Sequence, residues 1–182
     1  MDVQHIFSTN GAFAALKSDG AVVTWGEPSL GGTCPDGLAD VQHIYASTQS
    51  FAALKSDGVV VAWGCDVPAA VENALAQQKE DGKVLSTTSN EDAIVALKAD
   101  GSVVAWGLPD YGGSCSQVQG QLASDVQHIY STQQAFAALK ADGSVVTWGG
   151  ENHGGDSSEV RQQLSDVQHI YSTSAAFSAL KA

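Results

Sequence analysis

The sequence predicts an all-β fold in which short blades of antiparallel strands repeat along the chain, and two recurring segments support this. The first runs, with small variations, from Phe-Ala-Ala-Leu-Lys through Asp-Gly to Val-Val-Thr-Trp-Gly, and its four copies end at Gly26, Gly64, Gly107 and Gly149. The second, Asp-Val-Gln-His-Ile, begins at Asp2, Asp40, Asp125 and Asp166, which gives a period of about 41 residues. Such a period indicates similar units, each too small to bury its apolar surface alone.

We treat the 182 residues as one repeat array rather than as separate domains. The units cover approximately residues 2–39, 40–80, 81–124 and 125–165, and a partial unit covers 166–182. The third unit begins with a divergent copy of the second segment at Asp81.

Three strands are expected in each unit, and the fourth unit shows them most clearly. Its β-branched and aromatic runs are residues 126–130, 136–140 and 145–148. Asp142 and Gly143 separate the last two runs, and the same Asp-Gly pair recurs in the other three complete units. Asp-Gly between apolar runs is typical of a two-residue type I′ turn, with positive φ at both residues. The sequence therefore predicts four hairpins of this type.

The predicted strands lack the alternation of apolar and polar residues that is typical of a sheet with one solvent-exposed face. Residues 59–63 (Val-Val-Val-Ala-Trp) are apolar at every position, so both faces of this strand must be covered. Sheets stacked around an axis cover both faces, and so do sandwich layers. The paired alanines let neighbouring sheets approach closely, which favours the blades of a propeller.

The connections after each Trp-Gly differ between units. In the first, third and fourth units they contain a Gly-Gly pair, which indicates backbone with positive φ. The pairs Val118/Leu122 and Val160/Leu164 have the i, i+4 spacing of one or two helical turns. The second unit lacks the glycine pair, and residues 68–80 are expected to form a longer helix there.

The repeated pattern of Trp-Gly, a downstream Gly, Ala-Leu, Asp-Gly and the Val-x-x-Ile spacing (Val41, Ile44; Val126, Ile129) resembles the RCC1 (regulator of chromosome condensation) repeat. The resemblance covers essentially the whole chain. It implies a β-propeller, here an RCC1-like propeller or partial propeller of four to five short blades with short helical turns in the connections. The family commonly has seven blades and repeats of about fifty residues, so this chain has fewer and shorter units.

The resemblance implies protein binding by loops on one face of the ring, while members of the family have unlike activities. They include a nucleotide exchange factor that binds nucleosomes, interaction domains of ubiquitin ligases, and a β-lactamase inhibitor. The family's usual Gly-Gln-Leu-Gly after the Trp-Gly loop is replaced here by Gly-Gly followed by Thr, Ser or Asp. No functional residue of a family member is therefore transferred to this chain.

The net charge of -12 arises from 20 Asp and Glu against 8 Lys and Arg. This field disfavours nucleic acid and anionic membrane surfaces, and it favours a protein partner with a basic surface. We recognise no signal peptide and no apolar stretch of about 18 residues, so we expect no direct membrane insertion. These features and the odd count of 3 cysteines favour an intracellular location.

The partial last unit ends before its Asp-Gly turn and its Trp-Gly strand. Three explanations follow. The chain is a fragment of a longer ring, or a small closed or distorted ring, or its spare strands pair with another chain in a homo-oligomer or a larger complex.

The less uniform residues after Trp-Gly are the best candidates for partner binding. They are Glu27 and Leu30 in the first unit, Asp110 and Tyr111 in the third, and Glu151, Asn152 and His153 in the fourth. An exposed tyrosine beside acidic residues is a typical binding hot spot. We recognise no catalytic motif and expect neither an enzyme nor a bound cofactor or metal. The sequence thus predicts a non-enzymatic scaffold that binds a protein through these loops.

Two alternatives remain open. The chain could be a structural subunit that docks into a larger complex through its unfinished terminal blade. It could also be a metal- or glycan-binding ring that uses the repeated tryptophans or the histidines at one repeat position, His5, His43, His128 and His169.

Overall fold

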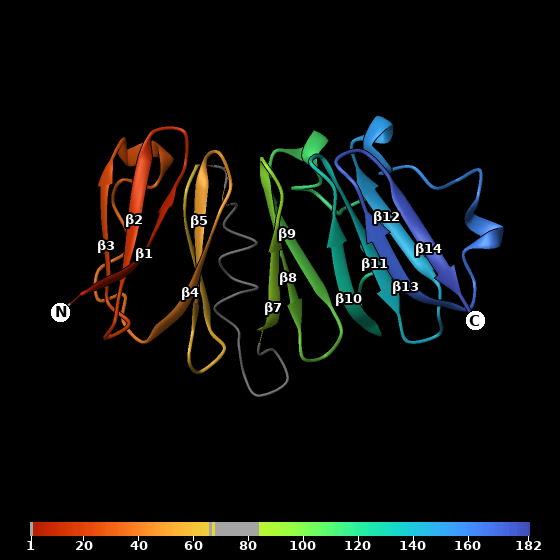
Figure 1. Cartoon of the computed structure of the whole chain (residues 1–182), viewed down its shortest axis with the longest axis horizontal. Coiled ribbons are helices and arrows are strands. Elements are labelled where there is room, and N and C mark those ends of the chain that lie inside the picture. Colours follow the sequence, from red (N-terminus) through yellow and green to blue (C-terminus); the bar gives the residue numbers. More distant parts are fainter. Residues whose placement is uncertain (1, 66, 68–83) are drawn as a thin grey trace.

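A computed structural model describes residues 2–65, 67 and 84–182. In these residues the chain forms five small antiparallel sheets, here called blades one to five, which stand side by side in chain order (Figure 1). The first and the last blade lie at opposite ends of this row. The predicted all-β fold class is confirmed.

Blades one to four have three strands each, and blade five has two. Blade one contains β1 (Val3–Ser8), β2 (Ala12–Lys17) and β3 (Val22–Gly26), and blade two contains β4 (Val41–Ala46), β5 (Ser50–Lys55) and β6 (Val60–Gly64). Blade three contains β7 (Val84–Ser89), β8 (Ala93–Lys98) and β9 (Val103–Gly107), and blade four contains β10 (Val126–Ser131), β11 (Ala135–Lys140) and β12 (Val145–Gly149). Blade five contains β13 (Val167–Ser172) and β14 (Phe177–Lys181).

The four predicted hairpins are confirmed, but the predicted turn type is wrong. In the first hairpin the Gly20 N–H donates to the Lys17 carbonyl at 3.0 Å, and Gly20 has a φ of 77°. Asp19 is not among the residues with positive φ. This geometry is a type I turn followed by a left-handed glycine, the three-residue hairpin loop. The Asp19 carboxylate accepts a hydrogen bond from the Ala21 N–H at 3.1 Å, and this bond favours aspartate at this position of the turn.

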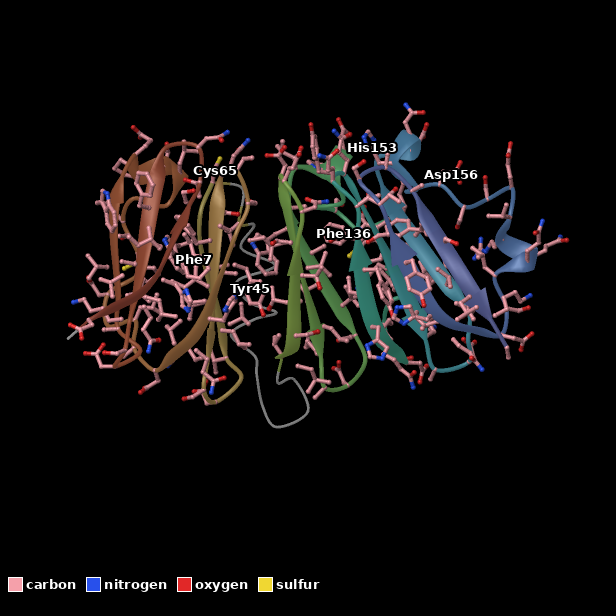
Figure 2. All side chains as sticks on the ribbon, in the orientation of Figure 1. Phe7, Tyr45, Cys65, Phe136, His153 and Asp156 are labelled. Carbon is pink, nitrogen blue, oxygen red and sulfur yellow. The ribbon has the colours of Figure 1, made fainter. Side chains whose placement is uncertain are left out.

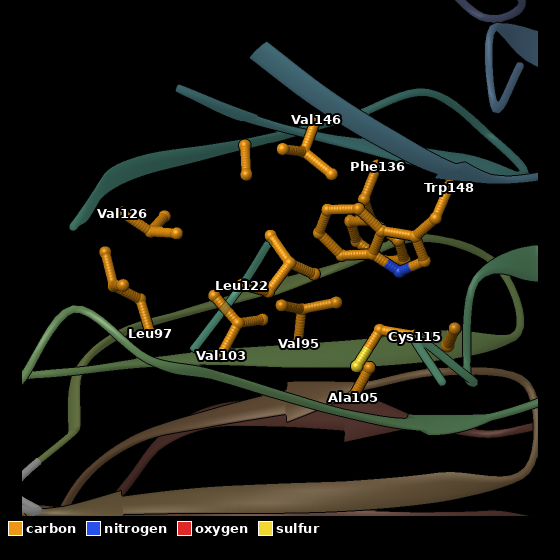
Figure 3. Close-up of a cluster of buried hydrophobic side chains, with 12 residues drawn as sticks. Val95, Leu97, Val103, Ala105, Cys115, Leu122, Val126, Phe136, Val146 and Trp148 are labelled. Atoms are coloured by element: carbon orange, nitrogen blue, oxygen red, sulfur yellow. The ribbon is translucent and has the colours of Figure 1, made fainter. Parts of the chain in front are cut away.

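The hydrophobic core lies between the blades, because the middle strand of each inner blade is buried on both faces. In β11, Phe136 and Ala138 pack toward blade three, while Ala137 and Leu139 pack toward blade five. Figure 3 shows the cluster between blades three and four, where Phe136, Val146 and Trp148 of blade four face Val95, Val103 and Ala105 of blade three. The third strand of blade two, for which the sequence predicts cover on both faces, is covered less completely: Val60 and Trp63 are buried, and Val59, Val61 and Ala62 are half-buried.

Backbone hydrogen bonds also join neighbouring blades. In blades one to four, the turn between the first two strands donates a backbone N–H to a carbonyl in the equivalent turn of the following blade. The bonds run from the Asn10 N–H to the Thr48 carbonyl (2.8 Å), from Thr48 to Glu91 (2.6 Å), from Glu91 to Gln133 (3.5 Å) and from Gln133 to Ser174 (3.0 Å). This ladder runs through all five blades and fixes their order and spacing.

The described connections contain short 3-10 turns, as the sequence predicts. Three of them follow a Trp-Gly pair: η1 (Pro28–Leu30), η3 (Pro109–Tyr111) and η4 (Glu151–His153). A fourth, η5 (Arg161–Gln163), precedes blade five. The helix predicted over 68–80 and the divergent segment at Asp81 lie outside the described residues. No helix within the described ranges is long and apolar enough to cross a membrane.

Candidate partner-binding groove

The loops after Trp-Gly in blades one, three and four have the same backbone conformation. Each loop contains one 3-10 turn that ends at a glycine in the left-handed region, with φ of 96° at Gly31, 88° at Gly112 and 90° at Gly154. The glycine rests on a ring of the next blade, since a Cβ on Gly112 would lie 2.6 Å from Phe136 Cδ2. A fixed backbone therefore presents different side chains in each loop, all along one edge of the row (Figure 1).

The third residue of each 3-10 turn points back toward the sheets. Leu30, Tyr111 and His153 are half-buried, and their carbonyls accept hydrogen bonds from the side chains of Thr9 (3.0 Å), Asn90 (2.8 Å) and Thr132 (2.9 Å). Tyr111 also packs against the core cluster between blades three and four. The sequence predicts an exposed tyrosine at position 111, but Gly112 closes the turn and Tyr111 is directed inward.

The other four predicted residues are exposed, and three of them border one groove. Asp110, Glu151 and Asn152 line a cavity of about 850 Å³ between the loops of blades three and four. Glu27 and Leu30 lie in the loop of blade one and are not part of this cavity. The structure thus brings Asp110, Glu151 and Asn152 together around one cavity, which Tyr111 and His153 do not line, and the candidates of the first unit stay apart from it.

The walls of the groove come from polar residues that the sequence analysis does not single out. Ser114, Ser116 and Gln117 line one side, and Thr147 lies on β12. The Thr147 hydroxyl donates to the Gly155 carbonyl at 3.0 Å, which ties the loop to its own blade. The only sequence signal of Ser114, Ser116 and Gln117 is that they lie in a connection that differs between units, and Thr147 belongs to the repeated strand and has no such signal.

Acidic groups dominate the charge of the groove. The carboxylates of Asp110, Glu151 and Asp156 line it together with one guanidinium, that of Arg161. Arg161 Nη2 donates to Gln121 Oε1 at 2.6 Å, so the guanidinium is held at one side. Hydrogen bonds from the backbone N–H and the hydroxyl of Ser158 lower the pKa of the Asp156 carboxyl. Figure 2 shows Asp156 near His153 at this edge of the molecule.

The groove also contains one thiol, that of Cys115. This cysteine is buried, and desolvation raises the pKa of its thiol. The thiol donates to Gln119 Oε1 at 3.0 Å. Because the thiolate is the reactive form of cysteine, this burial makes the Cys115 thiol less reactive.

Two of the repeated histidines, His43 and His169, make aromatic contacts with the preceding blade. The ring of His43 lies edge-on to Phe7 of blade one at 5.5 Å, and His169 lies edge-on to Tyr130 of blade four at 5.4 Å. Burial lowers the pKa of His43, and the nearby His5 lowers it further. In the part of the chain that the structure describes, no group of three or more His, Cys, Asp or Glu side chains is arranged to hold a metal ion.

Comparison with solved structures identifies the architecture. Prp20p from Saccharomyces cerevisiae matches 97% of this chain and 50% of its own, with a TM-score of 0.57 and 18% identity. Yeast RCC1 (Prp20) bound to Kap60 matches 81% of this chain and 44% of its own, with a TM-score of 0.53 and 16% identity. The fold is that of an RCC1-like propeller. This chain spans about half the length of the yeast proteins.

The RCC1-like fold also occurs in a plant receptor. The CRINKLY WD40 ectodomain of the Arabidopsis thaliana receptor kinase ACR4 matches 97% of this chain and 66% of its own, with a TM-score of 0.52 and 17% identity. No protein-family model and no curated protein sequence matches the chain. At these identities the RCC1-like structures establish the blades and their order, and the groove has to be interpreted from its own residues.

Proposed function

We propose that this chain is a non-enzymatic scaffold that binds a protein through the loops after its Trp-Gly pairs. One observation carries the proposal: the loops have the same backbone in three blades but present different exposed side chains. A rigid frame with variable residues is the usual design of a recognition surface. Among solved RCC1-like structures, yeast RCC1 (Prp20) is bound to the protein Kap60, which supports this use of the fold by analogy.

We propose further that the partner places a basic segment in the groove between blades three and four. The rim carries Asp110 and Glu151, and a third carboxylate, that of Asp156, lines the same groove. Opposite charges across an interface speed association and select the partner. Glu27 and Leu30 would take part only with a partner long enough to reach blade one.

A panel of fluorescent peptides of equal length tests the proposal: one rich in Lys and Arg, one rich in Asp and Glu, and one neutral. Binding is measured by anisotropy at low and high salt. We expect binding of the basic peptide alone and a loss of affinity at high salt. The double variant Asp110→Asn/Glu151→Gln should weaken it roughly tenfold, because each exposed pair contributes about 0.5–1 kcal/mol.

Glu159→Gln is the matched control for this experiment. Glu159 is an exposed carboxylate of the same connection and does not line the groove. Its replacement removes one charge and should leave the affinity unchanged. A loss of affinity per removed charge that is equal in the control and in the double groove variant would contradict a role for the groove and would attribute binding to net charge alone.

A further inference from the structure

One kind of interface is repeated between successive blades of this array. We call the side that a blade turns toward the next blade its forward face, and the opposite side its backward face. Between blades four and five, the forward face contributes Tyr130 and Leu139, and the backward face contributes Val167, Ile170 and Phe177. Between blades three and four, Leu97 of the forward face packs in the same way with Val126, Ile129 and Phe136 of the backward face.

The backward face of blade one is exposed. Its large apolar side chains are Val3 (51% exposed), Ile6 (60%), Phe13 (45%), Val23 (43%) and Trp25 (45%). The residues at these positions in blade four are buried or half-buried, namely Val126, Ile129, Phe136, Val146 and Trp148. These five account for most of the large exposed apolar side chains in the described residues. A contiguous patch of this kind marks an interaction surface.

The forward face of blade five is exposed in the same way. Tyr171 is 59% exposed and Leu180 is 50% exposed. Their counterparts in blade four are Tyr130, which is half-buried, and Leu139, which is 3% exposed. The molecule therefore carries both halves of one interface, and they lie at opposite ends of the row (Figure 1).

The polar groups of the two ends also match. At two junctions of the array the histidine of a blade meets the aromatic ring of the preceding blade, His43 with Phe7 and His169 with Tyr130. At the ends, His5 lacks a preceding ring and Tyr171 lacks a following histidine. The backbone ladder is also incomplete, because it begins with the Asn10 N–H and ends at the Ser174 carbonyl. The Asn10 carbonyl and the Ser174 N–H have no ladder partner among the described residues.

We infer that the backward face of blade one binds the forward face of blade five of a second copy of this chain. Tyr171 would then pack against His5, the Ser174 N–H would donate to the Asn10 carbonyl, and Leu180 would cover Phe13. The two partners use different surfaces, so the contact is heterologous and forms chains or rings.

This contact covers only part of the backward face. Inside the array, Trp148 Nε1 donates to the Gly112 carbonyl in the loop of the preceding blade at 2.9 Å. Blade five has no third strand and no such loop, so Trp25 of the second copy stays uncovered. We therefore expect a weak contact that depends on β1 and β2 more than on β3.

Sedimentation velocity over a wide range of protein concentration tests this inference. For the unaltered chain we expect a mean mass that rises with concentration beyond that of a dimer. Ile6→Asp disables the backward face, and Leu180→Asp disables the forward face. Each variant alone should remain a monomer, and an equal mixture of the two should form dimers and nothing larger, since one intact face remains on each.

Leu85→Asp is the matched control, because Leu85 is 61% exposed, belongs to the first strand of a blade and lies on neither end face. It should assemble as the unaltered chain does, and circular dichroism should show that all variants are folded. A monomer at every concentration would overturn the inference. So would assembly of Leu180→Asp by itself, which would mean that backward faces bind each other.

Discussion

The packing between blades predicts that one phenylalanine contributes very different stabilisation in two copies of the same segment. Phe136 in blade four is fully buried, whereas Phe13 in blade one is 45% exposed. Each ring stacks on the tryptophan of its own blade, at 5.6 Å for Phe136 and 5.4 Å for Phe13. The two alanine substitutions therefore share their local context and differ only in whether a preceding blade covers the ring.

The magnitudes follow from burial. Phe136→Ala removes a ring from a closed core and leaves a cavity, which costs about 3–5 kcal/mol. Phe13→Ala loses only the buried half of a transfer free energy of about 1.5–3 kcal/mol, and water fills the space, so we expect about 1 kcal/mol. With a urea dependence of about 2 kcal/mol per M, the midpoints should shift by about 2 M and about 0.5 M respectively.

Urea unfolding followed by tryptophan fluorescence and far-UV circular dichroism measures both shifts. The protein concentration should be the lowest that fluorescence allows, so that the end faces stay free. Equal shifts in the two variants would refute the reasoning, because burial by the preceding blade would then not be what stabilises the ring.

Three further predictions concern single contacts. Trp148→Phe leaves the Gly112 carbonyl without its buried donor, whereas Trp106 Nε1 is buried with no partner among the described residues. Trp148→Phe should therefore lower the free energy of unfolding by about 1–3 kcal/mol more than Trp106→Phe, as measured from urea midpoints. Gly112→Ala should be more destabilising than typical surface substitutions because of its φ of 88°, as a lowered melting temperature would show. In a carboxyl NMR titration, Asp156 should have a pKa below the ordinary value of about 4, and Ser158→Ala should raise it. Because the folded-state pKa is lowered, this stabilisation is complete above that ordinary value and is lost as the pH falls through the folded-state pKa.

The strands could be predicted because the same β-branched and aromatic runs recur in successive units. The fully apolar run at residues 59–63 requires cover on both faces, and the paired alanines permit it. The turn type could not be predicted from Asp-Gly alone, since that pair suits both a two-residue turn and a three-residue turn that ends in a left-handed glycine. Pairing of the flanking strands decides between them, and it places the Gly20 N–H on the Lys17 carbonyl.

The candidate site could be predicted by position but not by orientation. The variable residues after Trp-Gly do lie together at one edge, and Asp110 and Glu151 do share a groove. The inward direction of Tyr111 depends on the left-handed Gly112, which in turn rests on Phe136 of the next blade. A sequence read one unit at a time contains no information on that contact between units.

The residues that hold the blades together differ from those that we propose for partner recognition. Stability resides in the strands and in the glycines that seat each loop on the next blade, and these recur from unit to unit. Asp110, Glu151 and Asn152 belong to the first two residues of their 3-10 turns, and their side chains are exposed. Substitutions at these positions should therefore change the free energy of unfolding little. Because exposed positions on a rigid frame change affinity without changing shape, a repeat array of this kind can acquire different partners while it keeps the same blades.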